Sequence, residues 1–185
     1  MVKTYAPYNN ELLSEFPDAS ESDVDLAVKS AKEAFKTWRK TTVKERAKIL
    51  NKIADIIDEN KELLATVETM DNGKPIRETT LVDIPLAASH FRYFAGCILA
   101  DEGQATVLDE KFLSLILREP IGVVGQIIPW NFPFLMAAWK LAPALAAGDT
   151  VVLKPSSTTT LSLLVLMELI QDVIPKGVVN LITGK

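Results

Sequence analysis

The most constraining feature of this sequence is an alternation of short apolar runs and helix-like segments that begins at Ile121. The runs GVVGQII, TVVLK and VVNLIT are rich in β-branched residues, which is typical of strands in a buried parallel sheet. Two segments of helical length, 134–147 and 159–174, separate them. This order predicts a βαβαβ unit, with both helices on one face of the sheet because such crossovers are right-handed.

The first hundred residues are predicted to be helical instead. Ser20 and Ser22 are candidate N-caps of a helix in which apolar residues recur every three or four positions. Further helices are expected over KERAKILNKIADIIDEN, over KELLATVETM and over Pro85–Leu99. The third of these four helices should stop at DNGKP, because Asn, Gly and Pro together signal a turn. These helices, or another chain, are needed to cover the second face of the sheet.

Between the two halves, the pattern changes to extended chain. Gln104–Val107 and Phe112–Glu119 are predicted to form two extended segments around a turn at Asp109. The fold class is therefore α/β: N-terminal helices, a small extended pair and a partial Rossmann-like parallel βαβαβ unit. The corresponding parts are residues 1–101, 102–120 and 121–185.

Composition and charge exclude several classes of function. The chain has 185 residues with 20 Lys and Arg against 24 Asp and Glu, so nothing suggests a nucleic-acid partner. A single Cys and a single His leave no ligands for a His/Cys zinc site, and no other metal site is expected. One cysteine also fits a reducing compartment, and we expect the cytoplasm. The longest apolar stretch, 132–148, contains a lysine and two prolines, so no membrane span is expected.

Candidate site residues follow the predicted strands. Ligands of open α/β sheets bind outside the carboxyl ends of the strands, so these residues should meet at one edge. They are Ile127, Ile128, Pro129, Trp130 and Asn131 after the first strand, Lys154, Ser156 and Ser157 after the second, and Gly184 after the third.

Each candidate also has a simpler interpretation. Asn131 can donate to a developing oxyanion, but its chemistry alone favours a cap of the following helix. Lys154 can reach a phosphate or a ribose hydroxyl, although surface lysines are common at strand ends. Ser156 and Ser157 are potential caps of the next helix, whose N-terminus would then also suit a phosphate. Cys97 is expected to be a small buried apolar residue rather than a nucleophile.

Together, the motifs that contain these residues resemble those of a known protein family. The run EPIGVVGQIIPWNFPFLMAAWKLAPALAAGDTVVLKPSSTTTLS resembles the NAD(P)-dependent aldehyde dehydrogenase superfamily, through the elements PWNFP, APALAAG and VVLKPS. The N-terminal helices, DNGKP and RYFAG are also similar to that family. The likeness covers almost the whole chain and corresponds to about the first two-fifths of a family member.

The resemblance implies a role for each candidate. Asn131 would be the side-chain donor of the oxyanion hole, and residues 127–130 would line the cleft of the cofactor, NAD or NADP. Lys154 would bond the adenosine ribose, flanked by Ser156 and Ser157, and Gly184 would lie in the turn beside the cofactor. Residues 102–120 would belong to an oligomerisation sheet, so a homo-oligomer is expected. The substrate would be an aldehyde, oxidised to a carboxylic acid.

Two features limit what the resemblance implies for this chain. The family's cysteine nucleophile and its glutamate base lie downstream of the matched region, so we expect this N-terminal part to be inactive alone. Many NAD-using members have Glu where this chain has Ser157. Serine does not repel a 2′-phosphate, and Lys154 would attract it. We therefore expect the complete enzyme to accept NADP as well as NAD.

Two other functions remain open at this point. The chain can be a non-catalytic module that keeps the helices and half of a Rossmann-like fold for self-association or for binding a partner. Alternatively, it can come from a reductase that reduces an acyl group.

Overall fold

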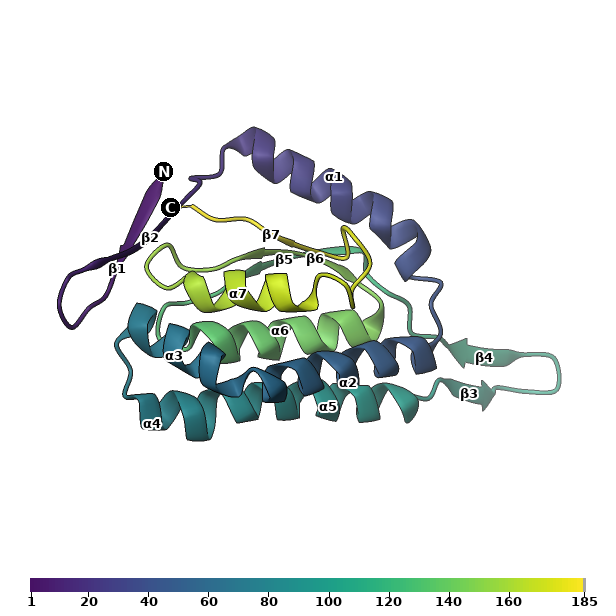
Figure 1. Ribbon diagram of the computed structural model, residues 1–185. Helices are drawn as coiled ribbons and strands as arrows, with labels where there is room; N and C mark the ends of the chain where they lie inside the picture. The colour runs from purple at the N-terminus through teal and green to yellow at the C-terminus, as the bar shows by residue number, and fades with distance from the viewer. Residues whose placement is uncertain (185) are drawn as a thin grey trace.

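The computed structural model describes residues 1–184, and the parallel sheet lies at its centre (Figure 1). Strands β5 (Val123–Ile127), β6 (Thr150–Lys154) and β7 (Val179–Leu181) lie in that order. Both pairings are parallel. Helices α6 (Pro133–Ala147) and α7 (Leu161–Ile170) connect them on the same face of the sheet. The predicted βαβαβ unit is confirmed, although its last residue, Lys185, lies outside the described residues.

Helix α1 (Glu21–Trp38) covers the opposite face of the sheet (Figure 1). Its start is fixed by a capping box, in which Ser20 and Asp23 each accept a hydrogen bond from the backbone N–H of the other. Of the two predicted caps, Ser20 is therefore correct. At the middle of the helix, the Thr150 hydroxyl donates to the carbonyl oxygen of Ala31 across 3.0 Å. The second face of the sheet is thus covered by this chain itself.

A further layer of helices packs beneath α6 and α7 (Figure 1). It consists of α2 (Val43–Glu59), α3 (Lys61–Asn72), a short α4 (Ile76–Glu78) and α5 (Ile84–Leu99). A single π-helical turn, Thr79–Asp83, joins α4 to α5. The buried faces of α2 and α5 pack against each other and against α6, so one apolar core extends from these helices to the sheet. Among residues 1–184, no helix has the length and apolar character required to cross a membrane.

Two hairpins lie at opposite ends of the molecule (Figure 1). β1 (Val2–Tyr5) and β2 (Leu12–Phe16) pair antiparallel at the N-terminus. The helical interpretation of the first half missed this hairpin, although the alternating burial of residues 2–6 has the period of a strand. β3 (Gln104–Val107) and β4 (Leu113–Ile116) form the predicted extended pair, shorter at its second strand than expected.

Candidate site at the carboxyl edge of the parallel sheet

The first two strands of the sheet end side by side. Ile127 of β5 lies opposite Lys154 of β6 in the parallel register. The next backbone N–H, that of Ile128, donates to the carbonyl oxygen of Lys154 across 3.0 Å. The residues that follow each strand therefore leave the sheet at one edge, which is where open α/β sheets bind their ligands.

The loop after β5 presents exposed side chains at this edge. Ile127 is 75% exposed and Trp130 is 64% exposed, and Pro129 and Asn131 are exposed as well. Ile128 differs from the prediction, because its side chain lies in the apolar core and is not available to a ligand. Strand alternation explains the difference, since neighbouring side chains point to opposite faces.

Asn131 does not cap helix α6, which corrects the simpler interpretation. The N-cap of α6 is Phe132, and no side chain of that residue bonds the helix start. Instead, the buried carboxylate of Glu68 accepts a hydrogen bond of 3.2 Å from the backbone N–H of Phe134. Within the described part of the chain, the Asn131 amide has no hydrogen-bond partner, so both of its N–H groups are available.

Lys154 is half-buried and held in place at the same edge. Its ammonium group donates to the carbonyl oxygen of Gly184 at 2.8 Å and to that of Pro155 at 3.3 Å. An ammonium has three N–H donors, so one remains for a ligand such as a ribose hydroxyl or a phosphate. Gly184 is buried and contributes its carbonyl oxygen to this arrangement.

Neither predicted serine caps helix α7. The N-cap residue is Thr160, and the first backbone N–H of the helix, that of Leu161, donates to the buried carboxylate of Asp71 across 2.8 Å. A carboxylate already occupies this helix start, so it is not the phosphate site that the sequence suggested. Ser156 instead bonds the Thr158 hydroxyl at 2.9 Å, within the loop. Ser157 is half-buried beside it.

Burial raises the pKa of the carboxyl groups behind the loop. Glu68 is fully buried, and loss of hydration raises its pKa to about 7, although hydrogen bonds from Ser162 and Phe134 act in the opposite direction. The pKa of Asp71 is also raised by burial, against a hydrogen bond of 2.6 Å from the Thr4 hydroxyl. These groups sit under the loop and carry no exposed face, so their contacts are with the chain itself.

Cys97 lies at the other end of the molecule from Asn131. It is near the C-terminal end of α5, beside β3, whereas Asn131 precedes the start of α6 (Figure 1). The prediction that it is buried is wrong, because the thiol is exposed. Its location nonetheless agrees with the expectation that it is not a nucleophile acting with Asn131.

The parallel α/β unit is Rossmann-like, and ligands of such folds bind at the carboxyl edge of the sheet. Comparison with known proteins shows to which family the chain belongs. The sequence profile of the aldehyde dehydrogenase family matches residues 1–185, and this chain belongs to that family.

The chain is similar to the N-terminal part of its relatives. It is 56% identical over 179 residues to an acetaldehyde dehydrogenase of Pseudomonas aeruginosa, covering 97% of this chain and 35% of that protein. The crystal structure of PnpE with nicotinamide adenine dinucleotide superimposes with a TM-score of 0.97 at 45% identity, over 100% of this chain and 38% of PnpE. The NAD+ complex of aldehyde dehydrogenase from Bacillus cereus gives a TM-score of 0.96 at 43% identity, over 99% of this chain and 38% of that protein. The chain thus spans about a third of these relatives.

Proposed function

We propose that this chain supplies the oxyanion donor and one side of the cofactor cleft of an NAD(P)-dependent aldehyde dehydrogenase. The observation that carries the proposal is the alignment of Ile127 with Lys154, which puts Trp130 and the Asn131 amide at the same edge of the sheet as the lysine. Membership of the family and the NAD complexes of two similar structures support it.

Asn131 is suited to stabilise a developing negative charge. Its amide is exposed, uncharged and free of other partners in the part of the chain described here, and the loop around it is hydrogen-bonded to α3 at Trp130 and at Phe134. A fixed neutral donor stabilises an oxyanion when the aldehyde carbon is attacked, because it need not reorganise during the reaction. The attacking thiolate and the base belong to regions of the family that this chain does not span, so no turnover is expected from these 185 residues alone.

The edge of the sheet fits NAD or NADP. The third N–H of Lys154 and the hydroxyl of Ser157 would meet the adenosine ribose, while exposed Ile127 and Trp130 would contact its apolar surfaces. When bound, the cofactor accepts a hydride. Serine at 157 carries no charge against a 2′-phosphate, so we expect the enzyme to use both cofactors. The single cysteine agrees with a cytoplasmic location.

The β3–β4 hairpin would associate with another copy of the protein. The cross-strand pairs Val107–Leu113 and Ala105–Leu115 place apolar side chains on one face of the hairpin. All four are exposed to solvent in this chain. A two-stranded hairpin with an exposed apolar face gains stability when another strand or sheet covers it.

Substitution of Asn131 tests the proposed function. In a protein of the relatives' length that contains this sequence, Asn131→Ala is expected to lower kcat by about a hundredfold to a thousandfold, as loss of an oxyanion-hole donor does. The KM for NAD should stay unchanged, and Asn51→Ala, on the exposed side of α2, should behave as the unsubstituted enzyme. A wild-type kcat for Asn131→Ala would refute the role assigned to this amide.

A further inference from the structure

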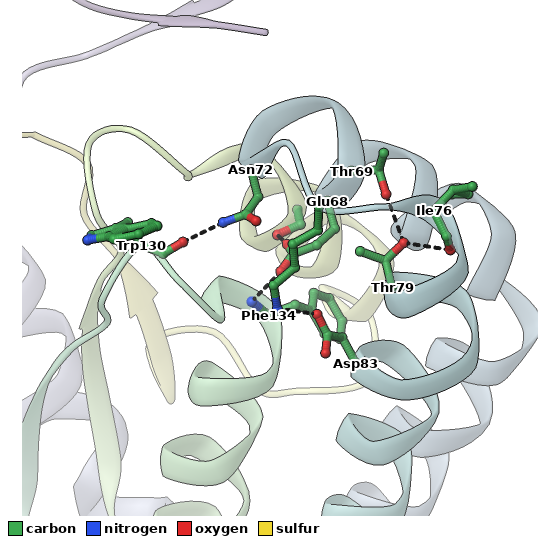
Figure 2. A network of polar contacts seen from close by, with 10 residues as sticks. Glu68, Thr69, Asn72, Ile76, Thr79, Asp83, Trp130 and Phe134 are labelled. Carbon is green, nitrogen blue, oxygen red and sulfur yellow. Dashed lines mark hydrogen bonds and ion pairs between the residues drawn. The ribbon is translucent and has the colours of Figure 1, made fainter. Parts of the chain in front are cut away.

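The loop that carries Asn131 is held from behind by residues of α3 and of the turn after it. Figure 2 shows Asn72 pointing at the backbone of Trp130 and Glu68 pointing at Phe134 at the start of α6. In the sequence, these two contacts flank Asn131. The residues of α3 and of the turn lie about sixty positions earlier in the chain, and none of them was predicted from the sequence to contact this loop. Three separate contacts join the two segments.

The first contact precedes Asn131. The side-chain amide of Asn72 donates a hydrogen bond of 2.6 Å to the carbonyl oxygen of Trp130. Asn72 is the last residue of α3, and the chain turns there because Gly73 adopts a left-handed conformation with φ of 84°. An added Cβ at Gly73 would also lie 3.2 Å from Cβ of Pro7. The turn therefore fixes where the Asn72 amide points.

The second contact follows Asn131. The ammonium group of Lys74 lies 3.4 Å from the centre of the Phe132 ring and 2.6 Å from the carboxylate of Asp83. Asp83 is 2% exposed and ends the π-helical turn. A cation above an aromatic face attracts the ring, and here the cation is itself fixed by a buried carboxylate. This contact joins the Phe132 ring to the turn after α3.

The third contact lies where the loop ends and α6 begins. The carboxylate of Glu68 accepts the backbone N–H of Phe134 and the hydroxyl of Ser162 from α7. The loop enters and leaves through bonds to the same short segment, residues 68–74. Between these bonds, the Asn131 side chain has no hydrogen-bond partner in the described chain, so the contacts fix the backbone from which its amide projects.

We propose that Asn72 and Lys74 are positioning residues that hold the Asn131 amide in the orientation an oxyanion requires. The inference rests on the proposed function, since Asn72 and Lys74 would affect the reaction only by positioning Asn131. Neither touches the reacting atoms. Their effect on rate would come through geometry, because a displacement of about 1 Å of a catalytic group can slow a reaction by about a hundredfold.

The contacts are tested first in the 185-residue chain by backbone ¹⁵N relaxation. In Asn72→Asp and Lys74→Met, the order parameters of Asn131 and Phe132 are expected to fall from about 0.85 toward about 0.6, the range of flexible backbone. The controls Asn51→Asp and Lys36→Met make the same changes of side chain on exposed helical surfaces and should leave both values unchanged. Unchanged order parameters in both loop variants would overturn the proposal. If Lys74→Met fails to fold because Asp83 is left unpaired, Asn72→Asp still decides the matter.

Kinetics of a protein of the relatives' length separates positioning from a general loss of structure. Asn72→Asp and Lys74→Met are expected to lower kcat about tenfold to a hundredfold with an unchanged KM for NAD. Lys74→Arg, which keeps the charge over Phe132, should restore most of kcat. If Asn131→Ala is slow while both loop variants keep wild-type kcat and order parameters, this inference alone is wrong. If Asn131→Ala has a wild-type kcat, the proposed function itself fails.

Discussion

The ammonium group of Lys154 lies 2.8 Å from the carbonyl oxygen of Gly184, a residue thirty positions further along the chain. The bond joins the end of β6 to the residues that follow β7, and it holds the lysine at the edge of the sheet. A lysine held in this way loses little conformational freedom when it binds a ligand. The same residue would otherwise be a mobile surface cation.

Cofactor choice is predicted to depend on Ser157. The unsubstituted enzyme should use both NAD and NADP, and Ser157→Glu should reduce kcat/KM for NADP relative to NAD by about tenfold or more, the factor equivalent to roughly 1.4 kcal/mol. The reason is repulsion between the new carboxylate and the 2′-phosphate. Parallel kinetics with the two cofactors measures this ratio. Thr158→Glu places the same charge on the next, exposed residue and serves as control. A strong preference for NAD before any substitution would contradict the prediction.

Stability is predicted to fall as pH rises through the titration of Glu68. The pKa of this group is about 7 in the folded chain against an ordinary value of 4.5, so the folded state binds the proton more tightly. The free energy of unfolding should therefore decrease between about pH 4.5 and pH 7, by up to roughly 3 kcal/mol. Urea denaturation at several pH values measures this slope.

Glu68→Gln should remove most of that pH dependence, because the amide stays neutral and still accepts the N–H of Phe134. A smaller slope of the same sign should remain from Asp71, whose pKa is also raised. Glu62→Gln, on the exposed side of the same helix, should keep the full slope. Identical slopes for Glu68→Gln and the unsubstituted chain would refute the prediction.

Arg46 is predicted to stabilise the junction between α1, α2 and α6. Its guanidinium is buried and donates to the carbonyl oxygens of Ala146, at 2.8 Å, and of Thr41. Arg46→Met should lower the free energy of unfolding by about 2 to 4 kcal/mol, because both carbonyl groups lose a charged donor. Thermal unfolding of this variant is compared with that of Arg39→Met, whose arginine is exposed. Equal melting temperatures for the two variants would contradict this assignment.

Self-association is predicted to depend on the apolar face of the β3–β4 hairpin. Leu115→Lys introduces a charge into the middle of that face, so the dissociation constant of the oligomer should rise by at least about tenfold. Light scattering coupled to size-exclusion chromatography measures the mass across a concentration series. Leu26→Lys changes an equally exposed leucine of α1 and should have no effect. An oligomer that tolerates Leu115→Lys would exclude this face as the interface.

The parts of the fold predicted correctly are those specified by neighbouring residues. Gly148 ends α6 as its left-handed C-cap, and Ser20 starts α1 as a capping residue should. The second crossover helix is shorter than the predicted 159–174, because α7 begins at Leu161 and already ends at Ile170. The N-terminal hairpin was missed because its strands are short and precede a long amphipathic helix that dominates the local pattern.

The candidate site was only partly predictable for a physical reason. The positions of Lys154 and Trp130 follow from where their strands end. The groups that hold them come from distant parts of the chain: Asn72 is 58 residues from Trp130, and Gly184 is 30 residues from Lys154. Nothing in the periodicity near Asn131 indicates a carboxylate from another helix, so a cap by Asn131 itself was the natural local interpretation. Such pairings arise only when the layers pack together.

Because α1 lies on one face of the sheet and the crossover helices lie on the other, residues 1–184 enclose both faces of the sheet by themselves. Once these residues have left the ribosome during synthesis, they can already cover both faces of the sheet, so its apolar surface is not open to chaperones or proteases. The order of these elements thus allows the α/β unit to fold as soon as β7 has been synthesised.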